Sequence, residues 1–136
     1  MTTNSPEIQS LKSLLTQKKY STVIKKCDAL LKSLTTPRLE IYLFKGIAHR
    51  ESNSLELARK TYLEALQLFP ENDNLLNDFA RLLIEEKSYS NAEKILKKLI
   101  DKDNNNYIAA NNLKALKEKI SMTNAAQELQ LKQHEA

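Results

Sequence analysis

"ESNSLELARKTYLEALQLFPEN" (residues 51–72) can be laid over "EEKSYSNAEKILKKLIDKDNNN" (residues 85–106) without a gap. In this alignment Ala58 falls on Ala92, and the two alanines lie 34 positions apart. A further step of 34 positions reaches Ala126. Self-similarity at a period of this length indicates stacked copies of one supersecondary unit.

Each copy predicts two amphipathic helices joined by a short turn, because apolar residues recur at helical spacing on both sides of the turn. In the clearest copy the second helix follows Ser54, and Pro70 ends it. The pairs Ser5 with Pro6 and Thr36 with Pro37 each place a capping hydroxyl before a proline, which is typical of the start of a helix. The pattern therefore predicts an all-α protein.

The composition supports this fold class, since the 136 residues include one glycine and three prolines, too few turn formers for a strand-rich fold. The single glycine, Gly46, lies inside a predicted helix, where glycine costs about 1 kcal/mol relative to alanine. We expect the helices of one hairpin to approach closely there, with Gly46 facing Ala58.

These positions resemble the tetratricopeptide repeat (TPR) family. The second copy carries the family pattern at Tyr42, Gly46, His49, Ala58, Tyr62, Ala65 and Pro70. The third carries it at Leu76, Phe79, Ala80, Leu83, Ala92, Leu96 and Leu99, with Asn104 in place of the proline. The first copy is looser, with Leu11 at the glycine position, and the fourth stops partway through its second helix.

The resemblance implies a right-handed α-solenoid of about four TPR-like helix-turn-helix repeats. We expect this solenoid to form a single domain over residues 1–136, with repeats at approximately 5–36, 37–72, 73–106 and 107–136. The end of the chain is strongly polar, so we expect its last helix to act as a cap that gives the stack a wettable outer side.

In the TPR family, the first helices of stacked repeats line a concave groove that binds a protein or peptide. By this resemblance the expected groove residues are Lys12, Leu43, Ile47, Arg50, Asn77, Arg81, Ile84, Asn111 and Glu118. Aliphatic patches mixed with arginine and asparagine suit an amphipathic helix or an extended peptide. An alternative for each residue is that it packs against a neighbouring repeat.

The resemblance also bears on the kind of partner. One known use of the family is a clamp of Lys, Asn and Arg on the C-terminal carboxylate of heat-shock chaperones. This chain does not match that clamp, because Phe44 stands where an asparagine is needed, and Asn74 and Asp78 where lysine and arginine are needed. We therefore expect a non-catalytic interaction module without the chaperone-tail clamp. The alternative is an accessory domain of, or acting beside, a larger enzyme such as a transferase.

Residues 101–112 ("DKDNNNYIAANN") have one feature of a calcium-binding EF-hand loop, oxygen ligands at the first, third and fifth positions. However, Asn106 stands where the loop needs glycine, and Asn112 stands where it needs a bidentate glutamate. We therefore predict a turn between repeats, with a helix from Tyr107 onward and no metal site.

No other pattern predicts catalysis or a cofactor. Cys27 falls on an apolar helix stripe, and His49 occupies a packing position, so neither indicates a nucleophile or a base. Aromatic residues are not interleaved with basic ones as nucleic-acid binding requires, so that partner is not expected.

The remaining expectations concern the compartment. One cysteine excludes an internal disulfide, and the chain lacks a secretory leader and an apolar run of membrane-spanning length. We expect a cytoplasmic protein, and the oligomeric state stays open.

Overall fold

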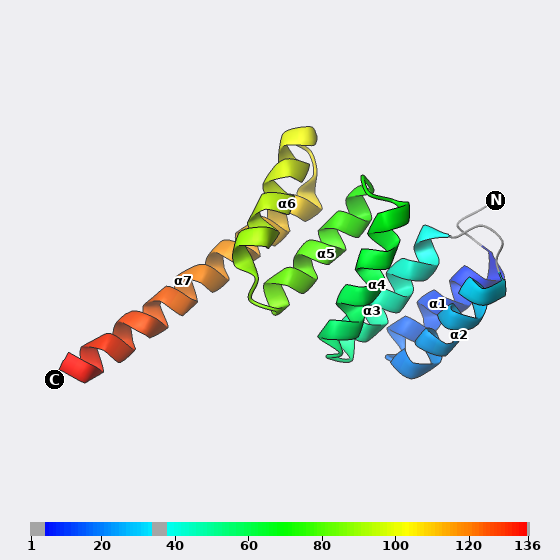
Figure 1. Ribbon diagram of the computed structural model, residues 1–136, viewed down its shortest axis with the longest axis horizontal. Helices are drawn as coiled ribbons and strands as arrows, with labels where there is room; N and C mark the ends of the chain where they lie inside the picture. Colours follow the sequence, from blue (N-terminus) through cyan, green and yellow to red (C-terminus); the bar gives the residue numbers. More distant parts are fainter. Residues whose placement is uncertain (1–4, 34–37, 136) are drawn as a thin grey trace.

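The computed structural model describes residues 5–33 and 38–135, and these residues form seven helices and no strand. The helices are α1 (Pro6–Thr16), α2 (Tyr20–Ser33), α3 (Leu39–Glu51), α4 (Leu55–Leu68), α5 (Asp73–Glu85), α6 (Tyr89–Lys102) and α7 (Tyr107–Glu135). Figure 1 shows the first six as successive hairpins stacked in chain order from the N-terminal side. The predicted all-α helical repeat is confirmed.

The three hairpins α1–α2, α3–α4 and α5–α6 turn in the same way. Each turn holds one residue in the left-handed conformation, with φ of 61° at Lys18, 65° at Asn53 and 65° at Lys87. In the second turn the amide of Ser54, the next residue, donates to the carbonyl of His49 at 2.8 Å. This closure resembles a Schellman motif, which satisfies carbonyls at the end of the first helix without requiring glycine.

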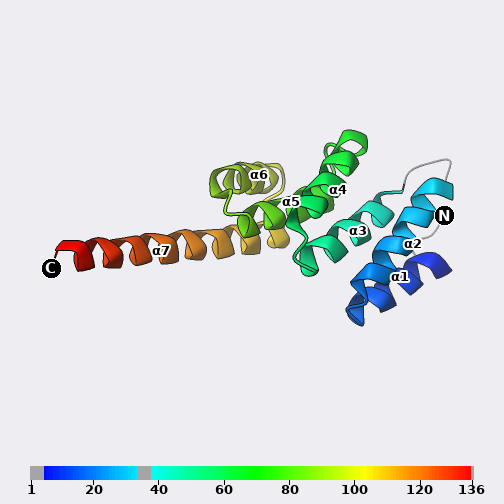
Figure 2. The same ribbon diagram turned by 60° about the horizontal axis from the view of Figure 1, so that its bottom comes forward.

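The fourth repeat differs from the prediction. Ser121 occupies the place of Lys87 one period later, but α7 continues through it as one helix of 29 residues. The prediction of a separate second helix in this repeat is therefore wrong, and within the described residues α7 does not fold back over the stack. Figures 1 and 2 both show the C-terminal half of α7 extending away from the other helices.

The reason lies in the side chains that a returning helix would bury. The second helix of the preceding hairpin buries Ala92, Leu96 and Leu99. The equivalent positions in α7 are Ala126, Gln130 and Gln133, so folding back would remove two amide side chains from water for little apolar contact. Residues 121–134 are accordingly exposed on every side.

The core is a chain of three apolar clusters, each shared by consecutive hairpins. One joins α1 to α3 around Val23 and Ile41, the next joins α3 to α5 around Tyr62, and the last joins α5 to α7 around Leu96. Contacts between helices run only between near neighbours in the sequence, as the nearest-neighbour character of solenoids requires.

Gly46 marks a close approach within the α3–α4 hairpin, and its nearest neighbour across it is Tyr62 rather than the expected Ala58. A Cβ added at Gly46 would lie 2.4 Å from Cε1 of Tyr62, so the tyrosine ring takes the space that the missing side chain leaves. The mechanism of close approach is therefore as predicted, and the partner residue is corrected.

Side chains cap the starts of α1 and α5, and the start of α1 is a predicted one. The amide of Ile8 donates to Ser5 Oγ at 3.3 Å, directly before Pro6 at the first position of α1. Asn72 Oδ1 accepts from the amide of Leu75 at 3.1 Å and so caps α5. The start expected at Thr36 and Pro37 lies outside the described residues.

The turn predicted within residues 101–112 is confirmed. Asp103 Oδ1 accepts from the amide of Asn105 at 3.0 Å, and Asn106 Oδ1 accepts from the amide of Ala109 at 3.0 Å. These side chains order the turn and the first turn of α7, which begins at Tyr107 as expected. Their oxygens therefore have a local structural role.

Candidate functional site

A groove lies on the face formed by α3, α5 and α7, the first helices of three consecutive repeats. It contains a cavity of about 250 Å³, lined by Glu40, Leu43, Phe44, Ile47, Asn74, Asn77, Asp78 and Ile108. We call this set the groove cavity. Its walls are apolar at Ile108 and on α3 apart from Glu40, and polar on α5, so three helices line one hollow.

Three of the expected groove residues, Leu43, Ile47 and Asn77, line the groove cavity. The prediction missed Glu40 and Ile108. It also missed Phe44, Asn74 and Asp78, although the sequence carried a signal for them. They occupy the positions compared above with the chaperone-tail clamp.

Asn77 is the most buried polar group in the groove cavity, with 2% of its surface exposed. Its Nδ2 donates to Asn106 Oδ1 over a long 3.4 Å, and its Oδ1 has no hydrogen-bond partner among the described residues. A buried acceptor left unpaired costs about 1–3 kcal/mol. This oxygen, which has almost no accessible surface, is therefore an unpaired acceptor of a residue that lines the groove cavity.

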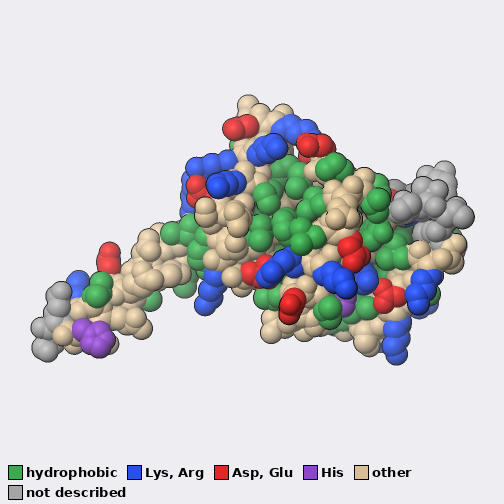
Figure 3. All heavy atoms as spheres, in the orientation of Figure 1, with side chains coloured by type: hydrophobic (Ala, Val, Ile, Leu, Met, Phe, Trp, Pro, Cys, Tyr) green, Lys and Arg blue, Asp and Glu red, His purple; other side chains and the backbone are tan. Residues whose placement is uncertain are grey.

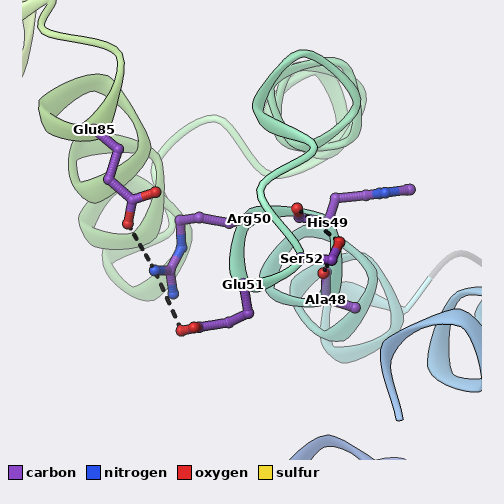
Figure 4. Close-up of polar contacts among 6 residues, drawn as sticks. All are labelled: Ala48, His49, Arg50, Glu51, Ser52 and Glu85. Carbon is purple, nitrogen blue, oxygen red and sulfur yellow. Dashed lines mark hydrogen bonds and ion pairs between the residues drawn. The ribbon is translucent and has the colours of Figure 1, made fainter. Parts of the chain in front are cut away.

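Arg50 has a different position from the other expected residues, because its side chain is 4% exposed and lies between α3 and α5. Its Nη1 is 3.1 Å from Glu85 Oε1 and 3.4 Å from Glu51 Oε1. Figure 4 shows the guanidinium reaching from α3 toward Glu85, with Glu51 beside it and His49 pointing away. Within this structure Arg50 joins two repeats rather than lining the groove cavity.

The other expected residues also separate into groups. Ile84 is buried in the cluster shared by α5 and α7. Lys12, Arg81 and Asn111 are exposed on α1, α5 and α7, outside the groove cavity. Glu118 lines a different hollow of about 770 Å³ between α6 and the middle of α7.

Charged groups of opposite sign meet beneath the groove cavity. Burial raises the pKa of the Asp78 carboxyl above its ordinary value, while Arg50 and Arg81 oppose that rise. Burial and the neighbouring Asp78 raise the pKa of the Tyr62 phenol. Asp78 is therefore a partly desolvated carboxylate that lines the groove cavity and interacts with two arginines.

The two residues considered for catalysis, Cys27 and His49, are both buried. Cys27 is fully buried, and burial raises the pKa of its thiol to about 12, so it is protonated and unreactive near neutral pH. Burial and the nearby Lys45 lower the pKa of His49. Within residues 5–33 and 38–135, no group of three or more His, Cys, Asp or Glu side chains is placed to hold a metal ion.

The opposite face carries apolar surface as well. Figure 3 shows hydrophobic side chains over α5, between α4 and α6, with charged side chains around them. A hollow of about 310 Å³ there is lined in part by Leu76 and Ile95, and the ion pair between Lys102 and Asp73 (2.9 Å) joins its two sides. No helix among the described residues is long and apolar enough to span a membrane.

Three stacked helical hairpins followed by α7 define an α-helical repeat protein, and its groove cavity lies on α3, α5 and α7. Residues 40–116, more than half of the chain, match the sequence model of the tetratricopeptide repeat family, and the chain belongs to that family. This confirms the resemblance, at the copies where the pattern was clearest. TPR units generally mediate protein–protein interactions and are typically non-catalytic scaffolds. Comparison with curated proteins gives no match.

Proposed function

We propose that this chain is a non-catalytic adaptor that binds a peptide segment of a partner protein in the groove formed by α3, α5 and α7. The observation that carries the proposal is the groove cavity of about 250 Å³, where apolar side chains lie beside Asn77, whose side-chain oxygen has no hydrogen-bond partner among the described residues. It is smaller than the roughly 300–1,000 Å³ usual for drug-sized ligands, and so suits one or two side chains of a longer segment.

The lining supports a peptide for two reasons. Leu43, Ile47 and Ile108 offer apolar contact for an anchoring side chain. Asn77 offers an unpaired acceptor to a polar hydrogen of the peptide. Lys12, Arg81 and Asn111, exposed on first helices of the repeats, extend this contact along the groove.

Two matched variants test the groove. Ile108 lines the groove cavity and is 55% exposed, whereas Leu57 lies on α4, away from it, and is 51% exposed. Both positions should tolerate an aspartate with little effect on stability, because surface substitutions usually change the free energy of unfolding by less than about 0.5 kcal/mol. Ile108→Asp should disrupt the groove, and Leu57→Asp is its control.

The wild-type chain and both variants are used as bait in a cell lysate, and captured proteins are identified by mass spectrometry. The captured segment is then synthesised and titrated by calorimetry. We expect Ile108→Asp to weaken binding at least about tenfold, as for loss of an interface anchor, and Leu57→Asp to leave it unchanged. Equal binding by the two variants would show that the partner does not bind in this groove.

A further inference from the structure

The polar lining of the groove cavity consists of hydrogen-bond acceptors and amides. Its eight lining residues include two carboxylates, Glu40 and Asp78, and no lysine or arginine. An acidic lining in a chain of net charge +4 is unexpected from composition, and it disfavours an anionic ligand group at this point.

A second observation, independent of the carboxylates, also calls for a donor. Asn77 lines the same cavity, is almost fully buried, and leaves its Oδ1 without a partner among the described residues. Acceptors from Glu40 on α3 and from Asn77 and Asp78 on α5 therefore surround one hollow. A ligand group with several N–H donors would satisfy more than one of them at once.

The rest of the lining suits a side chain with an apolar stem. Leu43, Ile47 and Ile108 provide aliphatic contact, and Phe44 provides an aromatic ring. Arginine combines an aliphatic stem with a planar cation that packs on aromatic faces. Resting on the peptide-binding function above, we propose that the groove cavity takes an arginine side chain of the bound segment.

Cations of the chain lie near both carboxylates, but none of them lines the groove cavity. Arg38 meets Glu40 only at 3.9 Å, the outer limit of an ion pair. Arg50 acts on Asp78, but its guanidinium is also engaged by Glu85 and Glu51. Arg81 acts on Asp78 but is exposed and does not line the cavity, so solvent and salt screen its repulsion of an incoming guanidinium.

Arginine is favoured over lysine by the spread of the acceptors. The guanidinium carries five N–H donors in one plane, so it can donate to acceptors on two helices at the same time. An ammonium is a compact charge that keeps more of its hydration. The cavity's apolar walls disfavour that hydration.

The test uses small probes, so that it does not depend on knowing the partner. N-acetyl-arginine N-methylamide is titrated into the ¹⁵N-labelled full chain, in parallel with the citrulline and lysine analogues. Citrulline keeps the shape of arginine and lacks its charge. We expect shifts of the Asn77 side-chain amide and of residues 43–47, with arginine binding about fivefold or more tighter than citrulline, because charge-assisted hydrogen bonds are stronger than neutral ones.

Charge-removing variants locate the effect. Glu40→Gln and Asp78→Asn should each reduce the preference for arginine over citrulline, whereas Glu56→Gln, an exposed carboxylate on α4 outside the cavity, should not. If Asp78→Asn loses its helical signal, the partly exposed Glu40 decides the matter alone.

Equal binding of arginine and citrulline, tighter binding of lysine, shifts elsewhere on the chain, or no shifts would each overturn the arginine assignment. The peptide-binding function would survive any of these results if partner binding is still lost in Ile108→Asp and kept in Leu57→Asp. Loss of that difference, with arginine still shifting Asn77, would instead count against the peptide-binding function alone.

Discussion

The last turns of α3 and α5 occupy the same place in consecutive repeats, yet they bury opposite kinds of side chain. His49 and Arg50 end α3, and Leu83 and Ile84, 34 positions later, end α5. All four are buried. The repeat position therefore determines whether a residue is buried, and the neighbouring repeat determines which chemistry is stable there.

The neighbours explain the difference. Beside Arg50, α5 presents Glu85, whose carboxylate forms an ion pair with the guanidinium. Beside Ile84, α7 presents Ala109 and Leu116, which accept only apolar contact. A buried cation is stable at the Arg50 position because a carboxylate pairs with it. At the Ile84 position a cation would have no such partner.

The interior of the two hairpins differs in the same way. Gly46 and Tyr62 meet between α3 and α4, and the equivalent positions in the next hairpin are Ala80 and Leu96. A smaller residue on the first helix accompanies a larger one on the second. Total volume is kept, as close packing requires.

The test with the largest expected effect replaces a buried arginine and, separately, an exposed arginine of the neighbouring repeat by glutamate. Arg50→Glu should lower the free energy of unfolding by about 3 kcal/mol or more, because it removes the partner of Glu85 and adds a buried negative charge near Asp78. Arg81→Glu, at an exposed position, should cost about 1 kcal/mol or less, because solvent weakens its interaction with Asp78. Urea denaturation followed by circular dichroism measures both, and equal stability of the two variants would contradict the buried role of Arg50.

A smaller effect is expected at the close approach of α3 and α4. Gly46→Ala should cost about 1–2 kcal/mol, since overpacking against the buried Tyr62 exceeds the gain of about 1 kcal/mol in helix propensity. Adding Tyr62→Leu copies the pair Ala80 and Leu96. The double-mutant cycle should show a favourable coupling of about 1 kcal/mol, and additive losses would show that the two side chains do not compete for space.

The third test uses pH. The folded-state pKa of His49 is lowered below the ordinary value of 6.5, so its contribution to stability is complete above that value. It is lost as pH falls from there through the lowered folded-state pKa, because the unfolded chain takes up the proton first. The melting temperature should fall as the pH is lowered from about 7.5 to about 5.5. It should fall less in His49→Leu, which carries the residue found at the equivalent position, Leu83. An identical fall in the two proteins would assign the effect to other groups.

The smallest effect is expected where α7 leaves the stack. Deleting residues 122–136 should change the free energy of unfolding by less than about 0.5 kcal/mol, because residues 122–134 are all exposed. Urea denaturation measures the change, and amide exchange of the intact chain should be fast in this segment. A loss above about 1 kcal/mol would mean that the segment packs on the hollow beside Glu118, in its own chain or in a second copy.

Hairpins, their period and the turn before α7 could be predicted, because capping and amphipathic spacing act over a few residues. The groove was predicted in part. Leu43 and Ile47 follow from helical spacing, but the place of Ile108 depends on how α7 crosses α5. Arg50 was expected to face a partner, because its sequence position is that of a groove residue. It is buried instead, because the neighbouring helix α5 supplies Glu85 as its ion-pair partner.

The sequence by itself determined the helices, the 34-residue period and the family, since hydrogen bonding and apolar spacing along a helix are local. Tertiary structure decided the rest. It buried Arg50 against another repeat, left Asn77 Oδ1 unpaired beside two carboxylates, and kept α7 straight where a hairpin was expected. The physical reason is common to all three: the free energy of a side chain depends on the groups that a neighbouring helix presents to it, and those groups are distant in the sequence.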